Sequence, residues 1–89
     1  MSVQSERLEL ARQIALESGA TRLIVFGSAA DSPETARDLD LACAGVDGWK
    51  LFELGARLEQ ALRIPLDLVP LEPTSKFTRM IERQGRVLL

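Results

Sequence analysis

The chain has 89 residues, a formal net charge of -2 and 46% hydrophobic residues, which describes a small globular protein rather than a disordered or membrane one. It contains no histidine and a single cysteine, so Ser-His-Asp and Cys-His catalysis are excluded, as are an internal disulfide and a zinc site of histidines or several thiolates. The acidic balance argues against a broad surface for binding nucleic acid.

Neither the apolar runs nor the first residues of the sequence have the pattern expected of a membrane-targeting segment. No apolar run approaches the roughly 18 residues of a transmembrane helix, and the first residues, M-S-V-Q-S-E-R, lack the apolar core of a signal peptide. We therefore expect a cytoplasmic protein. We expect residues 1–89 to form a single domain, whose small core could gain stability from homo-oligomerisation.

The first elements are a helix, a strand and a tight turn. Apolar side chains at helical spacing predict a helix from Ser5 to about Ser18. The run from Leu23 to Phe26 has the length and β-branched content of a buried strand. Gly27-Ser28 then permits a tight turn and the close approach of a ligand, and Ser28 to Asp31 can form little more than one helical turn.

A second apolar run follows the loop from Ser32 to Arg37 and carries Asp38 and Asp40. In a strand, these two side chains project from one face. Carboxylates so close repel each other and favour a bound cation, and Mg²⁺ is usually held by one or two carboxylates together with substrate phosphates. A polar, solvent-facing side of a strand is the alternative interpretation.

A turn at Asp47-Gly48 begins the next helix, which we expect to end near Leu62. Its wide apolar stripe includes Trp49 and Phe52. We predict that both aromatic rings belong to the core and are not platforms for stacking bases.

A third strand is predicted from Leu66 to Val69, where Asp67 is the lone polar residue. A carboxylate in an apolar strand is costly unless it is exposed or paired, and a role as a third metal ligand would explain it. Thr74 or Ser75 begins a last helix, and Val87 to Leu89 could form a short strand or an oligomer contact. The alternation of helix and strand predicts an α/β domain with its helices packed on one side of the sheet.

The G-S pair at a strand end, the D-x-D on the next strand and the later carboxylate together resemble the nucleotidyltransferase superfamily of DNA polymerase β. Within it, the chain is similar to the minimal nucleotidyltransferase (MNT) family over most of its length. The combined three-part motif is fairly specific, whereas either short motif alone would carry no weight. The resemblance implies a small polymerase-β-like fold with a mixed sheet of three to four strands and a catalytic face open to solvent.

The resemblance also implies a reaction. Gly27 and Ser28 would hold the terminal phosphates of ATP. The carboxylates of Asp38, Asp40 and Asp67 would hold two Mg²⁺ ions. Asp67 would also accept the proton of the attacking hydroxyl group. MNT proteins often act as antitoxins to HEPN-type toxins, some by transferring AMP from ATP to a toxin tyrosine. We therefore expect a nucleotidyltransferase antitoxin whose partners are a nucleoside triphosphate and a HEPN-type toxin.

One departure from the family pattern motivates a competing hypothesis. The stretch that usually resembles G-S-R-A-R-G reads G-S-A-A-D-S here, so Ala29 and Asp31 stand where arginines would neutralise a triphosphate. Arg37, Lys76 or Arg79 would have to compensate. The alternative is a catalytically degenerate MNT-fold module that neutralises its partner by contact alone. An RNA-modifying nucleotidyltransferase is disfavoured by the acidic balance.

Overall fold

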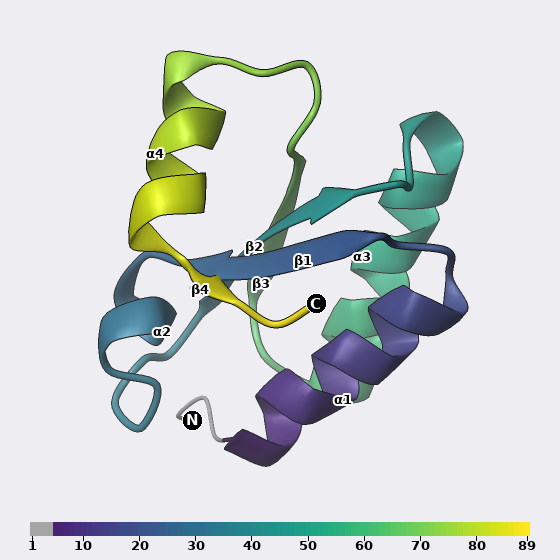
Figure 1. Cartoon of the computed structure of the whole chain (residues 1–89). Coiled ribbons are helices and arrows are strands. Elements are labelled where there is room, and N and C mark those ends of the chain that lie inside the picture. The colour runs from purple at the N-terminus through teal and green to yellow at the C-terminus, as the bar shows by residue number, and fades with distance from the viewer. Residues whose placement is uncertain (1–4) are drawn as a thin grey trace.

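The computed structural model describes residues 5–89 (Figure 1). Residues 1–4, on which part of the expectation about a targeting signal depends, lie outside the described residues. Within 5–89, no helix is both long enough and apolar enough to cross a membrane. The elements, in chain order, are α1 (Ser5–Glu17), β1 (Arg22–Phe26), α2 (Ser28–Asp31), β2 (Leu39–Ala44), α3 (Gly48–Leu62), β3 (Leu66–Pro70), α4 (Lys76–Gln84) and β4 (Arg86–Val87).

The strands form one mixed sheet in the order β3-β2-β1-β4, which confirms the predicted α/β fold with a mixed sheet. Strand β1 is antiparallel to both β2 and β4, whereas β2 and β3 are parallel and are connected through α3. The register places Phe26 opposite Asp40, and Asp40 opposite Asp67. The end of β1 and the starts of β2 and β3 therefore lie side by side.

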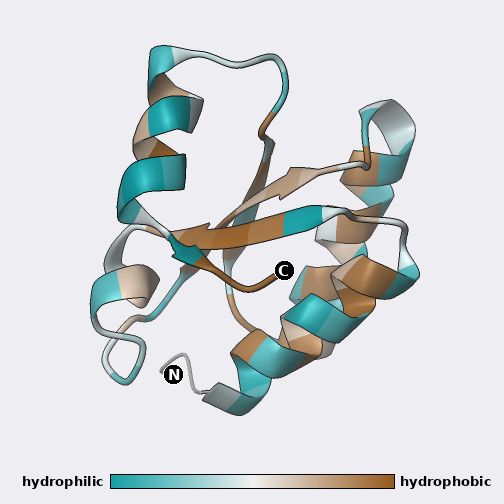
Figure 2. Cartoon of the chain, viewed as in Figure 1, coloured by the Kyte–Doolittle hydropathy of each residue, from teal (hydrophilic) through white to brown (hydrophobic). Residues whose placement is uncertain are grey.

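Helices cover both faces of the sheet, so the prediction that they pack on one side is wrong for α4. Helices α1 and α3 lie together on one face, and α4 lies on the other (Figure 1). The reason is the strand β1, which is hydrophobic along most of its length (Figure 2). Leu23, Ile24 and Val25 are all buried, and because neighbouring side chains in a strand point to opposite faces, both faces need cover. On the α4 side, Ile81 packs with Ile24 and Ala42.

The rotation of α3 about its axis also differs from the prediction. Its buried residues are Leu54, Leu58 and Leu62, which recur every four positions and form a single stripe. Trp49 and Phe52 fall on another side of the helix and are 73% and 68% exposed. Their rings stack on each other with centroids 5.3 Å apart. The prediction that these two aromatic residues belong to the core is wrong.

This difference can be tested by the loss of stability on truncation to alanine. Leu58→Ala removes a fully buried side chain, and we expect it to lower the free energy of unfolding by about 2–5 kcal/mol. Phe52→Ala removes an exposed side chain, and we expect a change of no more than about 0.5 kcal/mol. Urea denaturation followed by circular dichroism measures both. A loss for Phe52→Ala as large as that for Leu58→Ala would contradict this placement of α3.

Candidate active site

The structure brings the three predicted carboxylates together at the edge of the sheet face that α4 partly covers. Asp40 is the second residue of β2 and lies beside Asp67, its register partner in β3. Register partners direct their side chains to the same face of a sheet. The sequence predicts Asp38 within the same strand as Asp40, but the structure places Asp38 in a bend just before β2. That part of the prediction is wrong.

The three carboxylates carry uncompensated negative charge. Asp38 and Asp67 are exposed, and Asp40 is partly buried. Partial burial is the main cause that raises the pKa of Asp40, followed by repulsion from Asp38 and then from Asp67. Within residues 5–89, none of the three accepts a hydrogen bond or forms an ion pair. A cation at this site would relieve the repulsion.

Gly27 packs directly against Asp40. Its backbone has φ 72° and ψ -152°, a conformation that residues with a side chain rarely adopt. A Cβ atom on Gly27 would lie 2.6 Å from Oδ2 of Asp40, far inside the contact distance. The glycine therefore permits the turn and also leaves room for the carboxylate. The G-S pair and the D-x-D pair, separated in sequence by the loop, form one site.

Ser28 opens α2 next to this turn and is exposed. The backbone N–H of Ala30 donates to the carbonyl oxygen of Gly27 at 3.1 Å, and that of Ser32 donates to the carbonyl of Ser28 at 2.8 Å. The first N–H groups of a helix have no acceptor within the helix, and because that of Ala30 is engaged by Gly27, those of Ser28 and Ala29 are the ones that remain. Together with the Ser28 hydroxyl, they supply donors suited to phosphate oxygens.

The two residues that depart from the family pattern differ in what they can affect. Ala29 is 1% exposed and packs in the core, so this position offers no place for a solvent-facing cation. Asp31 is exposed and lines a hollow of about 190 Å³ together with Gly27, Met80 and Gln84. The departure at Asp31 therefore adds a negative charge beside the Gly27 turn, whereas the one at Ala29 only removes the possibility of a positive charge.

Of the three basic residues expected to offset the missing arginines, Lys76 and Arg79 do not line this hollow. Lys76 and Arg79 border a separate groove with Leu71 and Thr78, whereas Met80 and Gln84 are the α4 residues beside Gly27. Arg37 remains available, because it is exposed, immediately precedes Asp38 and forms no ion pair within the described residues.

Sequence reasoning missed the contribution of α4 to the site. Phe77 packs edge-on against Phe26, the residue before Gly27, with ring centroids 5.9 Å apart. Met80 and Gln84 then form one wall of the hollow. The signal that could have revealed this was the run of consecutive apolar residues in β1, which requires a helix on each face.

The carboxylates fit a metal ion that arrives with its substrate better than one enclosed by protein. In the part of the chain that the structure describes, no three His, Cys, Asp or Glu side chains are grouped so that they could hold a metal ion together, and this includes Asp38, Asp40 and Asp67. Mg²⁺ seldom needs a cage of protein ligands, because one or two carboxylates commonly hold it while water and substrate phosphates fill the other positions. Asp40, with Asp38 and Asp67 beside it, supplies oxygen ligands of this kind.

Replacing Gly27 tests its packing against Asp40. We expect Gly27→Ala to cost about 1–3 kcal/mol of stability and to force the Asp40 carboxylate to rotate. Gly48→Ala is the matched control, because Gly48 also has a positive φ but no atom within 4 Å of a Cβ built on it. Carboxyl NMR shifts should report a displaced Asp40 in the Gly27 variant alone. An unchanged Asp40 resonance in that variant would contradict the contact.

The raised pKa of Asp40 predicts a pH-dependent gain in stability for Asp40→Asn. Folding raises this pKa, so ionisation of Asp40 destabilises the native state. That cost is present at neutral pH and disappears as the pH falls through the raised pKa towards the ordinary aspartate value of about 4. Asp40→Asn should therefore raise the melting temperature at pH 7, and the gain should shrink on acidification. Asp47→Asn, at an exposed carboxylate, serves as the control, and an equal gain there would refute the explanation.

Neither a scan of family models nor a search of curated proteins found a match to the sequence, but solved structures do match. A protein assigned as a minimal nucleotidyltransferase is 28% identical, with a TM-score of 0.74 over 90% of this chain and 87% of that one. A toxin–antitoxin structure with AMP-PNP is 22% identical, with a TM-score of 0.75 over 97% of this chain and 73% of that one.

A third match is a chain from the structure of the tri-AMPylated Shewanella oneidensis HEPN toxin in complex with MNT antitoxin. It is 23% identical, with a TM-score of 0.64 over 92% of this chain and 71% of that one. All three likenesses extend over nearly the whole of this chain. The chain therefore has the fold of the minimal nucleotidyltransferases, the family that its sequence motifs resemble.

Proposed function

We propose that this protein is a Mg²⁺-dependent nucleotidyltransferase that transfers AMP from ATP to a hydroxyl group of another protein. The observation that carries the proposal is the meeting of Asp38, Asp40 and Asp67 beside the Gly27-Ser28 turn, where none of the three carboxylates forms an ion pair within residues 5–89. Unpaired carboxylates next to free phosphate-binding donors are suited to a metal-bound triphosphate.

We further propose that the protein acts in the cytoplasm as an antitoxin to a HEPN-type toxin. This proposal draws on similar structures. One of them contains AMP-PNP, an ATP analogue, and another is an MNT antitoxin in complex with an AMPylated HEPN toxin. Shared fold alone does not determine a reaction, so the proposal depends on the same site chemistry being present in this chain.

The residues divide the work according to their positions. The Ser28 hydroxyl and the first N–H groups of α2 bind the terminal phosphates, and Gly27 lets these phosphates approach the backbone. Asp38 and Asp40 would hold one Mg²⁺ on the triphosphate, and Asp40 and Asp67 would hold a second. When bound, two such ions neutralise charge on the triphosphate and lower the pKa of the acceptor hydroxyl.

The transfer is a displacement at the α-phosphorus of ATP. The acceptor hydroxyl oxygen forms the new bond to this phosphorus, the bond from the α-phosphorus to the bridging oxygen breaks, and pyrophosphate leaves with that bonding pair. Asp67, which is exposed at the edge of the sheet, receives the hydroxyl proton. Positioning and charge neutralisation supply most of the catalysis in such transfers, so the absence of histidine is no obstacle.

A second candidate function is favoured by Asp31. Its carboxylate lies beside Gly27, where it would repel a triphosphate. A protein with the same fold but a site too acidic for MgATP would neutralise its partner by surface contact alone. The two functions differ in whether the isolated chain binds nucleotide.

Calorimetric titration with ATP distinguishes these functions. We expect saturable binding that requires Mg²⁺ and that weakens at least about tenfold in the Asp38→Asn/Asp40→Asn double variant, equivalent to about 1.4 kcal/mol. The cause is the loss of the carboxylate ligands for the metal on the triphosphate.

The control for charge in the same site is Asp31→Asn. Removing this carboxylate should leave binding of MgATP unchanged or tighter, because one repulsive charge near the phosphates is lost. If neither the wild-type chain nor Asp31→Asn binds MgATP at millimolar concentration, the catalytic proposal is abandoned in favour of the contact-only module.

A further inference from the structure

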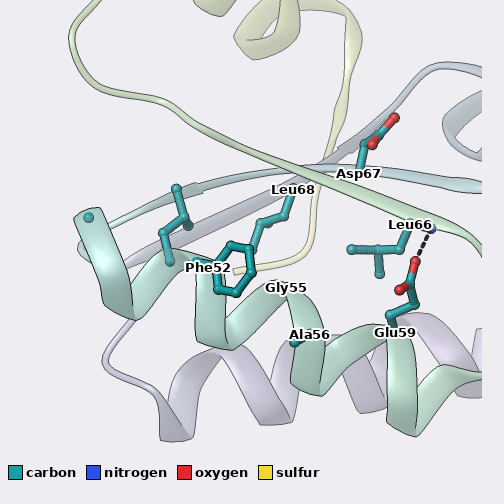
Figure 3. Close-up of a pocket in the computed structure, with 9 residues that line it drawn as sticks. Phe52, Gly55, Ala56, Glu59, Leu66, Asp67 and Leu68 are labelled. Carbon is teal, nitrogen blue, oxygen red and sulfur yellow. Dashed lines mark hydrogen bonds between the residues drawn. The ribbon is translucent and has the colours of Figure 1, made fainter.

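A groove runs along the free edge of the sheet, between α3 and β3. We call it the β3 groove. It has a volume of about 530 Å³. Figure 3 shows its lining side chains, with Phe52 above the helix and Leu68 facing it from the strand. The residues that line it are Gly48, Leu51, Phe52, Gly55, Ala56, Glu59, Leu66, Asp67 and Leu68.

Strand β3 is an edge strand, and half of its backbone groups point away from the sheet. The N–H of Leu39 donates to the carbonyl of Pro65, and the N–H of Leu71 donates to the carbonyl of Cys43. Because alternate residues of a strand bond to the same neighbour, the odd-numbered residues of this segment face β2. The backbone groups of Leu66 and Leu68 consequently point outward, along the β3 groove.

This open edge is short. The outward N–H of Leu66 already donates to Oε2 of Glu59 at 3.3 Å (Figure 3), and Pro70 has no N–H to offer. Leu68 is therefore the residue of β3 whose outward N–H and carbonyl are both free to pair with another chain. An added segment would gain few backbone hydrogen bonds here, so its side chains must supply most of the affinity.

The two faces of β3 differ in chemistry. Leu66 and Leu68 direct their side chains toward α3, whereas Asp67 points to the opposite face, as Figure 3 shows. A segment lying extended beside β3 would also alternate its side chains between these faces. Residues on one side would enter the apolar groove. The residue between them would meet Asp67, because side chains of directly opposed residues have Cβ atoms about 4.5–5.5 Å apart.

The groove is flanked by exposed aromatic side chains that the fold does not use. Trp49 and Phe52 are 73% and 68% exposed and stack on each other rather than on the core. Exposed aromatic clusters of this kind are common at protein interaction sites, where Trp in particular contributes strongly to binding.

From these observations, and resting on the proposed function, we infer that the β3 groove docks the acceptor: an extended polypeptide segment whose hydroxyl-bearing residue is flanked on both sides by apolar residues. The apolar neighbours would fill the space between Phe52, Leu66 and Leu68, and the hydroxyl would project onto the Asp67 face. The continuity of the groove with Asp67 identifies the occupant, because a segment bound there must present a side chain to the catalytic carboxylates.

Charge further defines the segment. The lining of the β3 groove contains two carboxylates, Glu59 and Asp67, and no lysine or arginine. Asp38 and Asp40 add to the negative potential on the Asp67 face. A segment with basic residues on the same face as its hydroxyl residue complements this surface, whereas an acidic segment would be repelled.

Two peptides of identical composition test the alternation. The first, acetyl-Lys-Leu-Tyr-Leu-Lys-amide, places leucines on one face and tyrosine with lysines on the other. The second, acetyl-Leu-Lys-Tyr-Lys-Leu-amide, puts lysines at the positions that would enter the groove. Trp49 is the only tryptophan, and the chain has no tyrosine. Because Trp49 stacks on Phe52, which lines the groove, selectively excited tryptophan emission should change when a peptide binds there. We expect the first peptide to bind saturably and at least tenfold more tightly than the second.

Phe52→Ala should weaken binding of the first peptide at least tenfold while keeping Trp49 as the reporter. The matched control is Leu16→Ala, which truncates another exposed apolar residue, 52% exposed, on α1, and should leave peptide binding unchanged. Equal affinity for the two peptides, or no effect of Phe52→Ala, would overturn the inference. A concentration-dependent dimer that Phe52→Ala abolishes, without peptide binding, would assign the groove to a second copy of this chain and overturn it as well.

Calorimetry with MgATP on the same proteins separates this inference from the proposed function. Phe52→Ala should bind MgATP as the wild type does, because Phe52 lies in the groove and not beside the Gly27 turn. If MgATP binds and the peptides show no preference, the docking inference alone is lost. If the peptides show the expected preference and MgATP does not bind, the catalytic proposal is lost and the β3 groove stands as a docking surface.

Discussion

The pairing register of β1, β2 and β3 is the constraint on which both the core and the candidate site depend. Because side chains alternate along a strand, the register that buries Leu39 and Leu41 under α1 and α3 also turns Asp40 to the other face. A slip of one residue would bury the carboxylate and expose the leucines. Burial of the leucines therefore determines where the carboxylates lie, although the carboxylates themselves do not stabilise the fold.

The position of α4 explains why one face of the sheet is only partly covered. Helix α4 closes over Ile24 and Ala42 near the middle of the sheet, and its capping box at Ser75 and Thr78 fixes where the helix begins. The carboxylates lie beyond its cover, at the ends of the strands. Coverage of the middle of the face and exposure of its edge together give a site that is open to a large substrate but still anchored to a rigid sheet.

Much of the fold could be predicted from sequence because its strongest signals are local. The apolar run at Leu23 to Phe26, the turn at Gly27 and the lone carboxylate in the third strand each appear within a few residues, and the structure has a strand or turn at each. The meeting of Gly27 with Asp40 could be anticipated from family resemblance but not from spacing alone, because the loop between them has no regular pattern.

The errors arose where the answer depended on contacts distant in sequence. Helix α3 has enough apolar residues for more than one stripe, and only packing against the sheet selects the stripe of Leu54, Leu58 and Leu62 over one that includes Trp49 and Phe52. The face chosen by α4 likewise depends on β1, some fifty residues earlier in the chain. Intrinsic helix pattern predicts that a helix forms, whereas tertiary contacts determine which side it buries.

The unfavourable environment of Asp40 has an evolutionary consequence. Most substitutions that a protein accumulates destabilise it, and those that relieve an unfavourable charge are among the few that do not. A lineage released from the need for this carboxylate would gain by losing it, so Asp40 is a position where drift should act early once selection on the site ends. Here Asp40 stands together with Asp38, Asp67 and the glycine that makes room for it. The chain therefore keeps a carboxylate at a position where partial burial and two neighbouring carboxylates both disfavour its ionisation.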